Sequence, residues 1–75
     1  MTSTPKHVII ATGADTGEEA MHIDGDLVTS EETIYACDIA AAVGDGIIQL
    51  SHVLADWSED WPDKYEALVP HLVAT

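Results

Sequence analysis

The chain has 75 residues, and fourteen Asp and Glu stand against two Lys, for a formal charge of −12 at pH 7. A chain of this length has room for one core, and its shortage of cations excludes binding that works by neutralising nucleic-acid phosphates. The composition is nevertheless 47% apolar, which is too high for a chain that its charge keeps unfolded. We therefore expect one small acidic domain over residues 6–75, after a flexible N-terminus at residues 1–5.

The N-terminal half predicts a small antiparallel meander over residues 6–28. Residues 6–12 are rich in β-branched side chains and too few for a helix, which favours a first strand. Residues 13–17, Gly-Ala-Asp-Thr-Gly, have the composition of a turn. Within residues 18–28, the dipeptide Asp24-Gly25 is typical of a tight hairpin, so two further strands are expected around it.

The C-terminal half predicts two or three α-helices, over residues 31–43, 46–60 and 62–72. A hydroxyl precedes a carboxylate by three residues in the segment 29–32, which is the pattern of a helix cap, and Gly44 is expected to end that first helix. At helical spacing, residues 46–60 place five apolar side chains on one face, namely Ile47, Leu50, Val53, Leu54 and Trp57. Pro62 suits the first turn of a third helix, which Pro70 is expected to kink or end. The predicted fold class is α+β, a meander packed on these helices.

Two stretches resemble known motifs, and each departs from its motif. Residues 38–54 resemble a helix-turn-helix in spacing, but their reading helix has no cation to turn toward bases and phosphates. Residues 24–32 resemble the latter part of a calcium-binding EF-hand loop, with Asp24, Asp26 and Glu32 as ligands. They lack the glycine of its sharp turn, and the first ligand position falls on His22. We expect a plain helical corner and a hairpin followed by a capped helix.

The sequence favours no catalytic, metal or cofactor site, so we do not expect an enzyme. The four histidines have no metal-ligand spacing, and His7 and His22 are expected at the surface. Cys37 is the only cysteine, which excludes an intrachain disulfide and favours a reducing, cytoplasmic compartment, and it is expected to pack as a small apolar residue. No phosphate-binding glycine loop, nucleophile elbow or membrane-spanning apolar run is present in the sequence.

The carboxylates form two blocks, separated by the uncharged residues 46–55. Nine lie between Asp15 and Asp45 with no basic residue among them. Five more surround the aromatic residues Trp57, Trp61 and Tyr65, which are either exposed anchors for a partner or part of the core. Such unpaired charge destabilises a small fold, so we expect it to serve a function or an environment.

We expect a small acidic interaction module, an inhibitor or DNA mimic that blocks a basic site on another macromolecule. The expected partner is a basic protein surface, such as that of a nucleic-acid-binding protein, and neither nucleic acid nor membrane directly. Small acidic inhibitors of phage are an analogy of size and charge. Two alternatives stay open. The first is a dimeric adaptor that pairs through the helix at 31–43, which is apolar on two sides. The second is a salt-adapted protein whose charge has no role in binding a partner. The expected contact residues are Glu31, Glu32, Asp38, Asp56, Trp57, Glu59, Asp60, Trp61 and Asp63.

Overall fold

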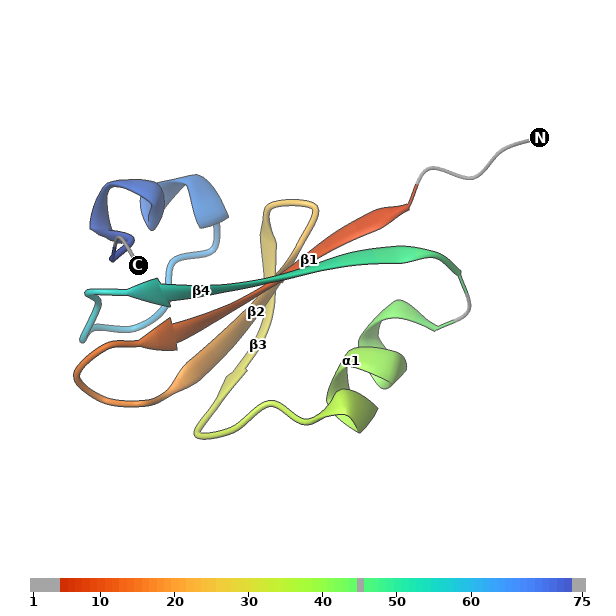
Figure 1. The fold of residues 1–75 in the computed structure, drawn as a ribbon, viewed down its shortest axis with the longest axis horizontal. Helices are drawn as coiled ribbons and strands as arrows, with labels where there is room; N and C mark the ends of the chain where they lie inside the picture. Colours follow the sequence, from red (N-terminus) through yellow and green to blue (C-terminus); the bar gives the residue numbers. More distant parts are fainter. Residues whose placement is uncertain (1–4, 45, 74–75) are drawn as a thin grey trace.

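The structure is a computed structural model that describes residues 5–44 and 46–73, and it contains a four-stranded mixed sheet (Figure 1). The strands are β1 (Lys6–Gly13), β2 (Glu19–Ile23), β3 (Asp26–Glu31) and β4 (Ile48–Ala55), in the order β3-β2-β1-β4. The first three strands are antiparallel neighbours, as the predicted meander requires. β4 joins the other side of β1 in parallel, with Lys6 opposite Ile48 and Gly13 opposite Ala55.

The hairpin between β2 and β3 turns where the sequence predicts it. Asp24 and Gly25 both have positive φ, 52° and 91°, as the favoured two-residue hairpin turn requires. The Asp24 side chain also accepts a hydrogen bond from the backbone N–H of His7, at 3.0 Å, which ties the turn to β1. This local part of the prediction is confirmed.

The first predicted helix is shorter than expected. β3 continues to Glu31, and α1 spans Ala36–Val43 instead of residues 31–43. Its N-terminal capping partner is Asp38, whose carboxylate accepts the backbone N–H of Tyr35 at 2.9 Å. The hydroxyls at residues 29 and 30 therefore lie in a strand and cap nothing. Gly44, at φ +63°, ends α1 as predicted.

The helix expected over residues 46–60 is wrong, because residues 48–55 form β4. The apolar residues of this segment fit both periods, and alternation also divides them into two faces of a strand. Parallel pairing with β1 supplies the backbone partners that a helix would have found within itself. With a strand at this position, the helical corner expected over residues 38–54 is also wrong, and the resemblance to a helix-turn-helix ends at the sequence.

The third predicted helix is wrong as well, since residues 62–72 form two 3₁₀ turns, η1 (Tyr65–Ala67) and η2 (Val69–His71). Pro70 lacks a backbone N–H and disfavours α geometry at the residue before it, which keeps both turns short. The predicted packing of a meander on two or three helices is therefore contradicted by a mixed sheet with one short α-helix and two 3₁₀ turns.

The two faces of the sheet carry different layers, as Figure 1 shows with α1 and the C-terminal turns well apart. On one face, Val8, Ile10 and Met21 are buried, and α1 packs on them through partly buried apolar residues, including Ile39 and Val43. On the other face the buried residues are Ala11, Ala55 and Leu68, and the C-terminal segment covers them with Trp57, Trp61, Tyr65 and Leu72. β1 is buried on both faces, as an inner strand with a parallel neighbour should be.

Two expectations about single residues are wrong. His22 is completely buried, and Cys37 is exposed on α1. The expected flexible N-terminus, apart from Pro5, lies outside the described residues, as does Asp45. Within residues 5–44 and 46–73, no helix is long and apolar enough to cross a membrane.

Candidate functional site

The sheet topology gathers exposed carboxylates at one end of the molecule, which we name the acidic end. β1 and β4 are parallel and finish there, β3 finishes there, and β2 begins there. The loop between β1 and β2, the end of β3 and the segment after β4 accordingly lie on one side of the molecule, at the left in Figure 1. Their exposed carboxylates are Asp15, Glu18, Glu31, Glu32, Asp56, Glu59 and Asp60.

Both lysines of the chain lie away from the acidic end. Lys6 begins β1, and Lys64 pairs with Asp26 beside the hairpin turn. We name this opposite end the turn end; its exposed carboxylates are Asp24, Asp26, Asp63 and Glu66. The acidic end thus combines seven exposed carboxylates with no lysine, whereas the turn end has four carboxylates and both lysines.

One half of the acidic end is a carboxylate cluster beside the start of β2 and the end of β3. Glu18, Ser30, Glu31 and Glu32 line a shallow cavity of about 220 Å³, and Glu31 and Glu32 also line its neighbour together with Tyr35. Glu31 and Glu32 are two of the predicted contact residues, and the structure adds Glu18 to them. Negatively charged carboxylate oxygens that face solvent are suited to bind ammonium or guanidinium groups.

The other half combines carboxylates with an aromatic side chain. Asp56, Trp57, Glu59 and His71 line a cavity of about 270 Å³ together with Ser58. The Trp57 ring meets the His71 ring edge to face, with centroids 5.0 Å apart. Its indole N–H donates to the backbone oxygen of Asp60 at 3.0 Å, which fixes the ring against the loop. The predicted contacts Asp56, Trp57, Glu59 and Asp60 are therefore brought together.

The structure does not bring the remaining predicted contacts to this end. The Asp38 carboxylate is engaged in capping α1. Trp61 packs partly buried in the core cluster around Leu68. Asp63 lies toward the turn end, where its backbone oxygen accepts the N–H of Leu27 at 2.7 Å. These three residues have structural surroundings that the charge pattern did not indicate.

A polar cluster lies on the α1 face of the sheet, just inside the acidic end. The Glu19 side chain is 17% exposed and accepts the backbone N–H of Ile34 at 2.7 Å and the hydroxyl of Thr12 at 3.2 Å. The Thr12 hydroxyl is also 3.0 Å from Nε2 of His52. Because that hydroxyl has a single proton and gives it to Glu19, His52 donates through Nε2 to the Thr12 oxygen. Glu19 therefore tethers the connection between β3 and α1.

His22 is the one buried polar side chain among the described residues. Its Nε2 lies 2.9 Å from the backbone oxygen of Pro62, so Nε2 carries a proton and donates it. Its ring also meets that of Tyr65, with centroids 5.8 Å apart. The Nδ1 atom is buried and has no hydrogen-bond partner in the described part of the chain. His22 thus fastens the C-terminal segment to the sheet.

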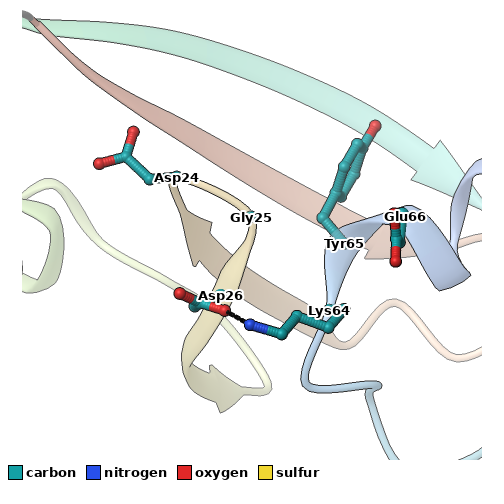
Figure 2. A pocket seen from close by; sticks show the side chains of 6 residues that line it. All are labelled: Asp24, Gly25, Asp26, Lys64, Tyr65 and Glu66. Carbon is teal, nitrogen blue, oxygen red and sulfur yellow. Dashed lines mark hydrogen bonds and ion pairs between the residues drawn. The ribbon is translucent and has the colours of Figure 1, made fainter.

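A cavity of about 340 Å³ lies at the turn end, between the hairpin turn and η1 (Figure 2). Figure 2 shows Lys64 extended toward Asp26, while the Asp24 side chain points away from it. The hydrogen bond from Lys64 to Asp26 and the charge of that carboxylate raise the pKa of Lys64. Since this ammonium already has an anionic partner, the cavity presents no free cation to an anionic ligand.

Sequence reasoning did not place Asp15, Glu18 and His71 in the site. The first two belong to the N-terminal carboxylate block and carry no local signal that sets them apart from Asp24 or Asp26. Their place at the acidic end follows from strand direction and register. Across residues 5–44 and 46–73, no group of three or more His, Cys, Asp or Glu is arranged to hold a metal ion. Comparisons of the chain with protein-family models, with curated proteins and with solved structures find no match.

Proposed function

We propose that this chain is a small acidic interaction module that uses its acidic end to occupy a basic site on another macromolecule. The partner class that fits is a nucleic-acid-binding protein of the cytoplasm, whose groove would accept carboxylates in place of phosphates. The observation that carries the proposal is the convergence of seven exposed carboxylates from three separate segments at an end without lysine. In such a role the protein acts as an inhibitor.

The convergence is informative because it is electrostatically unfavourable for the free protein. Like charges repel within a Debye length of about 8 Å at physiological salt, and neighbours such as Glu31 and Glu32 line one small cavity. A fold can relieve this repulsion by spreading its carboxylates over the surface or by placing lysines between them. Here both lysines lie elsewhere, which favours a surface kept ready for a cationic partner over one adapted only to salt.

Trp57 supplies an apolar contact for the partner, which the carboxylates alone do not provide. Charged rims speed association, whereas affinity depends largely on a few desolvated side chains, among which Trp is enriched. Trp57 is partly buried and lies beside Asp56 and Glu59, so a lysine or arginine side chain of the partner that pairs with these carboxylates also reaches the indole. Its hydrogen bond to Asp60 limits the freedom of the ring before binding.

The test compares two variants of equal charge. The acidic-end variant carries Glu31→Gln with Glu32→Gln, and the turn-end control carries Asp63→Asn with Glu66→Gln. None of these four side chains makes a hydrogen bond in the described structure, so both variants should fold. Affinity capture from a lysate of the source cells, at low and high salt, supplies the partner for kinetic measurements.

We expect nucleic-acid-handling proteins to be retained by the wild type and released by salt. The acidic-end variant should associate with the captured partner several-fold more slowly and with a flatter salt dependence, while the control keeps wild-type kinetics. Equal effects of the two variants would show that only net charge matters. Capture of no basic protein would also contradict the proposal.

A further inference from the structure

β4 leaves part of a sheet edge open. Its C-terminal half is covered, because Val73 donates to the backbone oxygen of Leu54 and Asp56 donates to that of His71, both at 2.8 Å. Backbone groups alternate in direction along a strand, so the even-numbered residues of β4 face outward and the odd-numbered ones face β1. Within the described residues, Ile48, Leu50 and His52 therefore present their N–H and C=O groups to no neighbouring strand.

This edge also has no carboxylate or lysine, and two of its three open residues are apolar. Leu50 is 57% exposed and Ile47, just before the strand, is 70% exposed. Residues 46–55 contain no Asp, Glu or Lys. Proteins usually protect an open edge with charge, proline or a bulge, and β4 has none of these. The opposite edge differs: β3 carries Asp26 and Glu31, and Leu27 is already paired with Asp63.

We propose that β4 pairs antiparallel with β4 of a second copy of this chain, about a two-fold axis at Leu50. The three open residues are symmetric about Leu50, so Leu50 lies opposite its counterpart and Ile48 lies opposite His52 of the other copy. Each open N–H then meets an open C=O, and the two sheets become one continuous sheet. A contact in which the same patch serves both copies is the commonest form of homodimer.

Charge selects both this occupant and this direction. A cationic partner is attracted to carboxylates, of which residues 46–55 have none, whereas the open residues of a second copy bring no negative charge to this edge. Antiparallel pairing of β4 places the two acidic ends at opposite ends of the dimer. Parallel pairing would place them side by side, and pairing through β3 would set Asp26 near Glu31 of the other copy.

The dimer is independent of the proposed function of the acidic end, so the two can fail separately. The first measurement is sedimentation equilibrium of the full chain at about 0.15 M salt, over a concentration series up to about 1 mM. We expect the mass to rise toward twice the 8.0 kDa of one chain. A mass that stays at that of the monomer would overturn the proposal, even if a strand of a different protein pairs with this edge.

The second measurement places the interface. Leu50→Lys puts two ammonium groups opposite each other at the axis and should weaken the dimer at least about tenfold. Val28→Lys adds the same charge to an exposed side chain of β3 and should leave the dimer intact. Both positions are exposed, so both variants should keep the wild-type circular dichroism spectrum.

Amide hydrogen exchange of the wild type tests the register without any substitution. The N–H groups of Ile48, Leu50 and His52 should become protected as concentration rises, while that of Val28 should not change. A dimer that leaves these three amides freely exchanging, or that survives Leu50→Lys, pairs elsewhere and would overturn the proposal.

Discussion

Glu19 accepts hydrogen bonds from the Ile34 N–H and the Thr12 hydroxyl, and the Ile34 N–H has no other acceptor in the described structure. In Glu19→Ala the Ile34 N–H loses its acceptor at a part-buried site, whereas the Thr12 hydroxyl can turn to Nε2 of His52. We expect this variant to lose about 1–3 kcal/mol of unfolding free energy, measured by urea denaturation.

Glu19→Gln is the matched variant for this prediction. Its amide oxygen can still accept from Ile34, and the Thr12 hydroxyl can turn to accept from the amide N–H₂. We expect Gln to retain most of the stability that Ala loses. If Ala and Gln lose the same amount, the charge of Glu19 matters and the two acceptor bonds do not.

Single residues show where sequence reasoning succeeds and where it stops. Trp57 and its acidic neighbours are adjacent in the sequence, so their grouping was predictable from the sequence. His22 was not, because its burial depends on a carbonyl at Pro62, forty residues later in the chain. A lone histidine with carboxylates two and three positions away in the sequence resembles a surface residue until the segment that covers it is known.

At the scale of elements, the hairpin turn depends on a backbone conformation that glycine adopts easily. Gly25 has φ +91°, and a Cβ added there would touch nothing within 4 Å. Gly25→Ala therefore tests conformational strain alone. We expect it to lower the unfolding free energy by about 1–2 kcal/mol in the same urea assay.

The control for the turn is Asp24→Asn. Asparagine tolerates positive φ, and its side-chain oxygen can still accept the N–H of His7. We expect little change in stability from this substitution. A neutral Gly25→Ala would mean that the turn adopts another conformation in solution.

The contact between Lys64 and Asp26 joins η1 to β3 and has a defined pH dependence. The pKa of Lys64 is raised in the folded protein, first by the hydrogen bond to Asp26 and then by the charge of that carboxylate. The stabilisation is complete below the ordinary lysine pKa of about 10.5 and is lost as pH rises through the raised value. We expect the melting temperature to fall in that alkaline range.

Asp26→Asn provides the comparison for this pH profile. Without the Asp26 charge, the part of the alkaline decline that comes from Lys64 should shrink, because only the weaker attraction of Asp63 and Glu66 then raises its pKa. The effect should be small because the pair is exposed. A variant whose alkaline decline matches the wild type would contradict this assignment.

The elements that local sequence specifies were predictable, and β4 was not. The strand at residues 6–12 and the Asp24-Gly25 turn depend on neighbours within a few residues. β4 pairs with β1, and the register that sets Lys6 opposite Ile48 spans more than half of the chain. Residues 48–55 fit a helix or a strand by periodicity, and only that distant partner decides between them.

At the scale of the whole molecule, charge repulsion should set how stability responds to salt. Screening acts mainly between exposed carboxylates at short range, since the Debye length falls to about 3 Å at 1 M. We expect the melting temperature to rise with KCl and to approach its limit by a few tenths molar. A protein adapted to a saline cytoplasm would continue to gain stability toward molar KCl.

The two equal-charge variants locate this repulsion. The acidic-end variant should show a smaller gain with KCl than the wild type, because it has lost two crowded carboxylates. The turn-end control should respond nearly as the wild type does, since its carboxylates lie nearer the lysines. If the gain is reduced equally in both, the repulsion is spread over the surface.

The acidic end is a property of topology, and the sequence shows only its ingredients. Glu31 and Asp56 belong to separate carboxylate blocks, and the uncharged residues 46–55 suggest that the blocks are apart. They lie at the same end of the molecule because β3 and β4, the two edge strands, both finish there. Charge counting therefore predicts an acidic surface but not where on the fold it lies.

The division of the molecule into layers has a spectroscopic consequence. Both indoles, Trp57 and Trp61, belong to the C-terminal layer on one face, whereas the single thiol of the chain, Cys37, is exposed on α1 against the other face. A dye that absorbs indole emission can be coupled to that thiol without adding or removing any residue. Energy transfer through the sheet would then report the separation of the two layers during unfolding, while indole emission alone follows only the layer that contains it.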